Sequence, residues 1–153
     1  MNRRDQIRMS DEEIAAFLAE ERTLIVASHG AGGHPHVVPM WFAMLDGKPA
    51  FWTYRTSQKV LNLRRDPRLS CLVEAGETYP ELRGVSIEGT AEIVEDPDQT
   101  LHIGAAVAER FAGPLDDTAR EGLRRSGAKR VAILVHPTKT VTWDHRKLPT
   151  STY

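Results

Sequence analysis

An alternation of apolar and polar residues over residues 82–94 constrains the fold of this chain more than any other feature. A period of two residues places successive side chains on opposite faces of a β-strand. One face carries Val85, Ile87, Gly89, Ala91 and Ile93, and the other carries Ser86, Glu88, Thr90 and Glu92. We therefore expect a half-buried strand, with one face on a core and the other in water.

The remaining strands and helices follow from apolar runs, turn residues and helix caps. Further strands are expected at 22–28, 36–45, 49–54, 68–75, 130–136 and 139–144, and helices at 10–21, 58–66, 96–111 and 116–126. The glycine-rich segment 29–35 and the Asp46-Gly47 turn predict hairpins, so the first three strands should form a meander. The last two strands should pair around Pro137. The sum is a mainly β fold, a six- to seven-stranded antiparallel split β-barrel with peripheral helices.

Length and composition narrow the class of protein. The length of 153 residues indicates one domain, with its core at about 10–145. The net charge of -1 argues against a nucleic-acid partner. No apolar run approaches the roughly 20 residues of a membrane span, and the start of the chain lacks the apolar middle of a signal peptide, so we expect a cytoplasmic protein that does not bind membranes. The single cysteine, Cys71, lies in an apolar run and should be a buried structural thiol.

Several enzyme classes are excluded by the motifs that the chain lacks. It contains no Gly-x-Ser-x-Gly elbow, no Gly-x-x-x-x-Gly-Lys loop and no Gly-x-Gly-x-x-Gly turn, which argues against hydrolases, nucleotide kinases and Rossmann enzymes. His29, His34 and His36 lie close together without helical spacing or cysteine and carboxylate companions. We interpret them as loop histidines and expect no metal site.

The segment Phe51–Pro67 joins a strand end, a cationic turn and a helix start. Ser57 is a favoured N-cap residue, so free amides and the positive end of the helix dipole should lie beside Arg55 and Lys59. That arrangement suits a phosphate. The alternative, that Lys59, Arg64 and Arg65 only solvate a helix face, stays open, although the position at a strand-to-helix junction favours the anion site.

The run Val37–Phe42 is unusual for a strand. Pro39 removes a ladder donor and so belongs at an edge or a bulge, while Trp41 and Phe42 should point to opposite faces. Such a strand offers a flat apolar shelf for a planar ring whose phosphate is held by the cationic turn. The alternative is that Trp41 and Trp52 are core or dimer contacts.

Three segments in succession, Pro39–Phe42, Phe51–Lys59 and Asn62–Ser70, resemble the split-barrel flavin and deazaflavin oxidoreductases, an FMN-binding split-barrel superfamily that includes pyridoxamine 5'-phosphate oxidase. The resemblance spans about 14–143 and is closest to the actinobacterial branch that uses coenzyme F420. It implies a homodimer with two interface sites, each with the cofactor ring against Val37–Trp41 and the phosphate near Arg55, Ser57 and Lys59. The cofactor-binding residues expected from it are Val37, Val38, Pro39, Trp41, Thr53, Tyr54, Arg55, Ser57, Gln58 and Lys59.

The predicted function is transfer of a hydride from reduced F420 to an electron-poor double bond of a small organic acceptor, such as an enone, a quinone or a tetrapyrrole. Tyr54, His36 or a water are candidates for delivering the proton, and no catalytic residue is assigned. The family's C-terminal Arg-x-His pair is replaced by Trp143-Asp144-His145-Arg146, which argues against oxidation of pyridoxamine phosphate.

Two other functions remain open for this sequence. One is an FMN-dependent oxidase or reductase, and the other is a non-catalytic binder of flavin, deazaflavin or haem, with His36 or His145 as haem ligands. The C-terminal residues 149–153 are expected to form a loose tail or an arm over the dimer partner.

Overall fold

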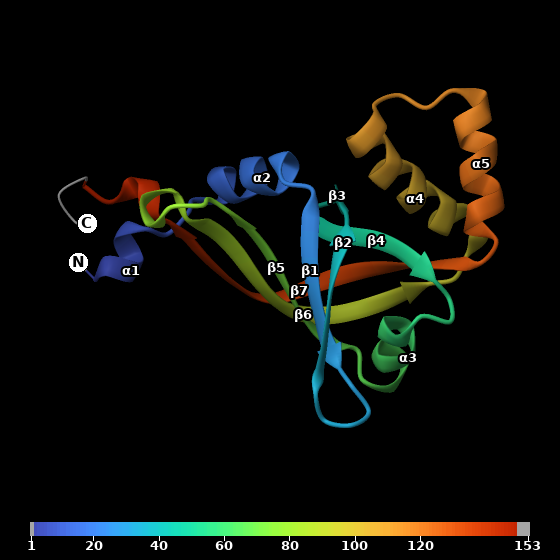
Figure 1. The fold of residues 1–153 in the computed structure, drawn as a ribbon, viewed down its shortest axis with the longest axis horizontal. Helices are drawn as coiled ribbons and strands as arrows, with labels where there is room; N and C mark the ends of the chain where they lie inside the picture. Colours follow the sequence, from blue (N-terminus) through green and yellow to red (C-terminus); the bar gives the residue numbers. More distant parts are fainter. Residues whose placement is uncertain (1, 150–153) are drawn as a thin grey trace.

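The computed structural model describes residues 2–149, and within them the backbone forms one seven-stranded antiparallel sheet in the order β2-β1-β5-β6-β7-β4-β3. The strands are β1 (Thr23–His29), β2 (Pro35–Trp41), β3 (Ala43–Leu45), β4 (Lys48–Tyr54), β5 (Arg68–Ala75), β6 (Arg83–Val94) and β7 (Arg130–Asp144). The helices are α1 (Arg3–Gln6), α2 (Asp11–Glu20), α3 (Gln58–Arg65), α4 (Pro97–Ala112) and α5 (Asp117–Gly127), with short 3-10 turns η1 (Tyr79–Glu81) and η2 (His145–Lys147). The predicted mainly β split barrel is confirmed (Figure 1). Most of the C-terminal tail lies outside the described residues.

The two edges of the sheet meet at Phe42. Trp41, the last residue of β2, pairs with Thr23 at one edge, and Ala43, the first residue of β3, pairs with Ala50 at the other. Because only Phe42 separates these two positions, the sheet must curl until its edges come together. The predicted single strand over 36–45 is therefore wrong, because the run breaks where the Phe42 ring enters the core and becomes fully buried. The two predicted hairpins are confirmed, since β1 pairs with β2 and β3 pairs with β4, but the break places them at opposite edges of the sheet.

Beyond Phe42 the two edges are unpaired. In the described structure β2 pairs only with β1, and residues 51–54 of β4 pair only with β7. We call these two free strand edges the split edges. They carry the two segments that the sequence singled out, because the apolar shelf lies on β2 and the cationic turn follows β4.

β7 corrects a second prediction. The expected strand pair around Pro137 is one continuous strand of 15 residues. Pro137 lies opposite Gly89, beside a register shift between Glu88 and Gly89, where a missing amide donor is tolerated. The Thr138 hydroxyl donates to the Glu88 carbonyl at 3.0 Å, which replaces a ladder hydrogen bond.

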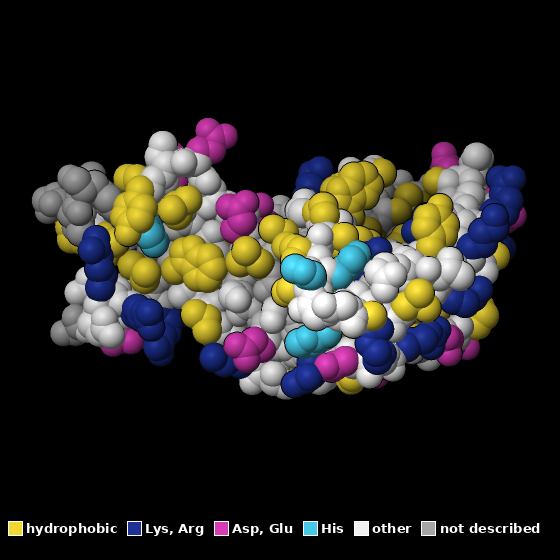
Figure 2. All heavy atoms as spheres, turned by 60° about the horizontal axis from the view of Figure 1, so that its bottom comes forward, with side chains coloured by type: hydrophobic (Ala, Val, Ile, Leu, Met, Phe, Trp, Pro, Cys, Tyr) yellow, Lys and Arg dark blue, Asp and Glu magenta, His cyan; other side chains and the backbone are white. Residues whose placement is uncertain are grey.

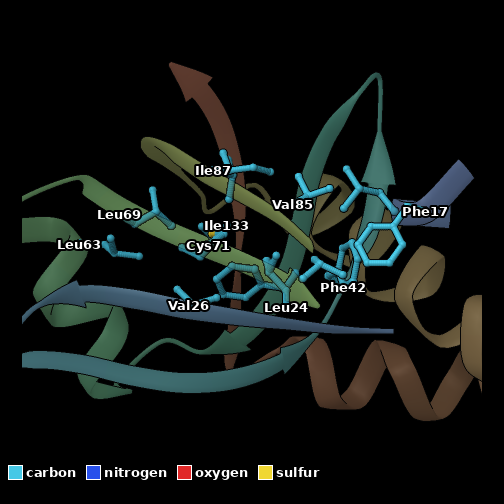
Figure 3. Packing of buried hydrophobic residues seen from close by; sticks show 14 of the residues in the cluster. Phe17, Leu24, Val26, Phe42, Leu63, Leu69, Cys71, Val85, Ile87 and Ile133 are labelled. Carbon is cyan, nitrogen blue, oxygen red and sulfur yellow. The ribbon is translucent and has the colours of Figure 1, made fainter. Parts of the chain in front are cut away.

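The core fills the inner face of the curled sheet. Figure 3 shows Val26, Leu69, Cys71 and Ile87 from β1, β5 and β6 packed together. On β6 the alternation holds through Ile93, because Ala91 and Ile93 also pack against this core, but Val94 is buried in a second cluster with Ile103 of α4. Burial raises the pKa of the Cys71 thiol to about 12, and the prediction of a buried structural thiol is confirmed.

The helices lie around this barrel and confirm the four that were predicted. Ser10 and Glu13 form the expected capping box at α2, and Asp96 caps α4. The short α1 was not anticipated. Figure 1 shows α1 at one end of the molecule and α4 and α5 at the other. Within residues 2–149, no helix is long and apolar enough to cross a membrane.

Arg110 of α4 fixes the junction at Phe42. Its Nη1 donates to the Phe42 carbonyl at 3.1 Å, and its guanidinium carbon lies 4.5 Å from the centre of the Phe42 ring. Its Nη2 donates to the carbonyls of Leu18 at 2.6 Å, Ala19 at 2.8 Å and Glu21. Burial, and then the charge of Arg22, lower the pKa of this guanidinium. One side chain thus ties α4, the end of α2 and the closure of the barrel together.

Replacing Arg110 by methionine should lower the free energy of unfolding by about 2–4 kcal/mol, because several carbonyls lose a charged donor. Urea denaturation measures this loss. The matched control is Arg120→Met, which removes only an exposed pair with Glu109 and should cost less than about 1 kcal/mol. Equal losses in the two variants would contradict the role of Arg110.

Candidate cofactor site

Three chain segments converge at the end of β4. The Tyr54 carbonyl accepts from the Ser57 amide at 3.0 Å, which closes the turn before α3. The Arg55 amide donates to the Lys129 carbonyl at 3.0 Å, and Tyr54 pairs with Arg130 of β7. The turn after β4 and the start of β7 therefore bring Arg55, Lys59, Lys129 and Arg130 together. From here on, the name cationic turn covers these four residues, because Lys129 and Arg130 join the turn that the sequence indicated.

Lys59 is the most constrained of these cations. Its Nζ donates to Thr53 Oγ1 at 3.0 Å, and the buried Thr53 hydroxyl donates to Ser57 Oγ at 3.5 Å. Burial, and then the charge of Arg130, lower the pKa of Lys59 from the ordinary 10.5. The half-buried ammonium thus has a neutral hydroxyl as acceptor and a second cation as neighbour, which is the environment of an anion site.

Arg130 was missed by the sequence analysis. Its guanidinium carbon lies 4.2 Å from the Tyr54 ring centre and 4.9 Å from that of Trp52, and its Nε donates to Ser126 Oγ at 3.0 Å. Nothing local marks this arginine, because it follows α5 and reaches the turn only through the pairing of β4 with β7. Its planar, always charged group suits a phosphate oxygen better than an ammonium does.

The start of α3 adds backbone donors. Ser57 occupies the N-cap position as predicted, but its side chain makes no capping hydrogen bond. No partner within residues 2–149 accepts from the amides of Gln58 and Lys59, and the Gln58 side chain donates to Asn62 Oδ1 at 2.8 Å. Gln58 is therefore available to a ligand chiefly through its amide.

Ion pairing separates the cationic turn from the rest of α3. Arg64 pairs with Glu95 at 2.5 Å, and Arg65 donates to the His29 carbonyl and to Asn62. By contrast, in the described part of the chain no carboxylate lies within ion-pair distance of any member of the cationic turn. Arg64 and Arg65 therefore hold the helix in place. The positive charges of the cationic turn are not neutralised by a carboxylate and can bind an oxyanion. Their donors fit the phosphate of a flavin-type cofactor.

The shelf on β2 is an edge strand with Pro39 inside it, as expected. Val37, Pro39 and Trp41 share the exposed face, where Val37 is 57% and Trp41 61% exposed. Val38 faces the core, so only its backbone remains for a ligand. The alternative for Trp41 is partly correct, because its ring stacks on Phe111 of α4 with centroids 3.9 Å apart.

The candidate proton donors have different surroundings. Tyr54 is 54% exposed and lies beside Arg130 at the cationic turn. The Nδ1 atom of His36 is buried and has no partner among the described residues. The Nδ1 atom of His145, on η2, donates to the Tyr79 carbonyl at 3.1 Å. Figure 2 shows histidine side chains over the β1–β2 hairpin, with Lys and Arg side chains beside them over α3. Tyr54 is thus the candidate that shares a site with the cations.

Comparison with known proteins gives a consistent assignment. The family profile described as pyridoxamine 5'-phosphate oxidase matches residues 10–144. A conserved hypothetical protein, Rv2991 from Mycobacterium tuberculosis, is 44% identical, with a TM-score of 0.91, over 100% of this chain and 97% of its own. No curated protein gives a significant match.

Two further structures carry cofactor names. One described as an F420 reductase is 26% identical, with a TM-score of 0.62, over 82% of this chain and 93% of its own. A FAD-binding protein from Mesorhizobium loti is 19% identical, with a TM-score of 0.66, over 88% of this chain and 94% of its own. This likeness concerns the fold alone.

Anion binding at the cationic turn should weaken at a lower pH than an ordinary lysine would impose. As pH rises through the lowered pKa of Lys59, the ammonium loses its proton while sulfate keeps both charges. We expect sulfate affinity in the native protein to fall as pH rises, at pH values below the ordinary lysine pKa of 10.5, and to persist in Lys59→Arg, whose guanidinium stays charged. The sulfate-dependent rise in Tm at constant ionic strength measures both. Equal pH dependence in the two proteins would exclude Lys59 as a ligand.

Proposed function

This chain belongs to the pyridoxamine 5'-phosphate oxidase family, and from that premise we propose that it is an oxidoreductase that binds coenzyme F420 between its split edges and the cationic turn. The observation that carries the proposal is the environment of Lys59. Its half-buried ammonium has a hydroxyl acceptor and a cationic neighbour, and no carboxylate among the described residues lies within ion-pair distance of it. An uncompensated positive charge costs folding free energy unless a ligand supplies the anion.

Each part of the site has a distinct role in this proposal. Lys59, Arg55 and Arg130 neutralise the phosphate, while the Ser57 hydroxyl and the amides of Gln58 and Lys59 orient it. Val37 and Pro39, on the exposed face of β2, would hold the cofactor ring. When bound, such a cofactor supplies a hydride to an electron-poor double bond, and a proton completes the reduction.

Residues at the end of β7 argue against pyridoxamine phosphate as the substrate. Arg146 binds Asp144 through two hydrogen bonds, Nε to Oδ1 at 2.9 Å and Nη2 to Oδ2 at 2.7 Å. This hydrogen bonding lowers the pKa of Asp144, and its effect outweighs that of burial, which raises the pKa. A guanidinium held in this way is committed to its own strand end, so a different substrate is proposed.

F420 is preferred to FMN because a protein that is 26% identical to this chain is described as an F420 reductase. FMN remains the alternative, since both cofactors present a tricyclic ring and a phosphate. Protein that purifies yellow would favour FMN, and colourless protein that binds added F420 would favour the proposal.

Replacing Lys59 or Arg130 by alanine should weaken F420 binding by about 1.5–3 kcal/mol, roughly 10- to 150-fold, because each removes a charged donor to the phosphate. Fluorescence titration of F420 measures the dissociation constants. Lys48→Ala, on the opposite end of β4, is the matched control and should leave the affinity unchanged. Unchanged affinity in Lys59→Ala would overturn the site assignment.

A homodimer is part of the proposal, and the outer face of the sheet supports it. The strand registers align Pro39, Ile25, Leu72, Ser86 and Val141 across five neighbouring strands. Val141 is 50% exposed, and Figure 2 shows apolar side chains left open on the molecular surface. An exposed apolar stripe of this kind typically marks a protein interface. A second copy covering the stripe would place its surface beside β2.

Charge on this stripe should separate the two copies. We expect wild-type protein to sediment at twice the monomer mass, and Val141→Asp to shift towards the monomer, because a carboxylate would be buried without a partner. Sedimentation velocity is the measurement. Leu61→Asp, at an equally exposed aliphatic residue on α3, is the control that should stay dimeric. A monomeric wild type would refute the dimer.

A further inference from the structure

We infer that Trp41, supported from below by Phe111, is the platform on which the hydride acceptor stacks, so that the enzyme prefers planar conjugated acceptors over non-planar ones. The inference rests on the proposed function for the reaction itself, but the contact that it names is independent of which cofactor is bound. It assigns Trp41 to the acceptor, whereas the sequence analysis assigned it to the cofactor.

The platform is a stack of three groups from three segments. The rings of Trp41 and Phe111 are inclined by 18° with centroids 3.9 Å apart. On Phe111 lies Arg22, with its guanidinium carbon 5.4 Å from the ring centre. Trp41 ends β2, Phe111 belongs to α4, and Arg22 precedes β1. One face of the indole is thus held in a fixed orientation before any ligand arrives.

The exposure of Trp41 in the single chain argues against a role confined to attaching α4 to β2. A tryptophan that served only to attach α4 to β2 would gain most by being buried, yet 61% of Trp41 is exposed while Phe111 beneath it is half-buried. Attachment of α4 is already provided by Arg110, which binds the Phe42 carbonyl. What Trp41 adds is a rigid, electron-rich surface that faces away from Phe111.

Location links this surface to the proposed cofactor. Trp41 lies on the same exposed face of β2 as Val37 and Pro39, at the closed end of the split edges next to Phe42. An acceptor on Trp41 would therefore lie beside a ring placed on Val37 and Pro39. Quinones and other fully conjugated carbonyl rings are flat, and flat rings stack favourably on indole.

Binding of menadione, a planar quinone, tests the platform without requiring turnover. Equilibrium dialysis should show the dissociation constant rising about threefold to tenfold in Trp41→Leu, the range expected for loss of an aromatic stack. Phe111→Leu should give a smaller rise, because it removes the support and keeps the indole. Trp143→Phe, which alters a tryptophan at the other end of the barrel, should leave menadione binding unchanged.

Steady-state kinetics with reduced F420 as hydride donor separates the acceptor role from the cofactor role. In Trp41→Leu we expect a raised KM for menadione with kcat nearly unchanged, and no change in KM for 2-cyclohexen-1-one, which is too small and puckered to stack. The F420 dissociation constant and the dimer mass should stay as in the wild type. If F420 does not bind the wild type, the proposed function fails, and menadione dialysis still decides the platform.

Three results would overturn the inference. They are unchanged menadione affinity in Trp41→Leu, an equal loss in Trp143→Phe, and a loss of F420 binding or of the dimer in Trp41→Leu. The last would return Trp41 to the cofactor site or to the subunit interface.

Discussion

Burial of Phe42 is the constraint on which the rest of the structure depends. Its ring enters the core while Trp41 and Ala43, on either side, pair at opposite edges of the sheet. The sheet must therefore close on itself at this point, and its edges remain unpaired beyond it. Arg110 secures the closure through the Phe42 carbonyl and three carbonyls near the end of α2. Burial of one side chain in the core thus produces the free strand edges on which the proposed cofactor would bind.

The same architecture gathers charge that folding alone would not favour. Pairing of β4 with β7 brings Arg130 to within cation–π distance of Tyr54 and close enough to Lys59 to lower its pKa. Mutual repulsion and partial burial both disfavour this cluster in the free protein, whereas a phosphate would reverse both effects. The unpaired cations consequently lower the stability of the free protein at this site, which is common at functional sites.

Sequence patterns anticipated the elements that local chemistry determines. The capping box at Ser10 fixes the start of α2, Pro67 separates α3 from β5, and the alternation in β6 holds as far as Ile93. Two predictions failed for tertiary reasons. The break at Phe42 depends on the burial of its ring in the core. The continuity of β7 through Pro137 depends on a bulge at Thr138, which lies in β7 itself opposite Glu88 and Gly89. Arg130 and Phe111 could not be identified from local sequence, because partners far along the chain give them their roles.

The central claim is that an oxyanion of a flavin-type cofactor is held by the cationic turn at the start of α3. A crystal structure of the complex with F420 tests it most directly. The account predicts the phosphate within hydrogen-bond distance of Lys59 Nζ, the Arg130 guanidinium and the amides of Gln58 and Lys59. A phosphate bound away from α3, or contacting Arg64 and Arg68 instead, would contradict it.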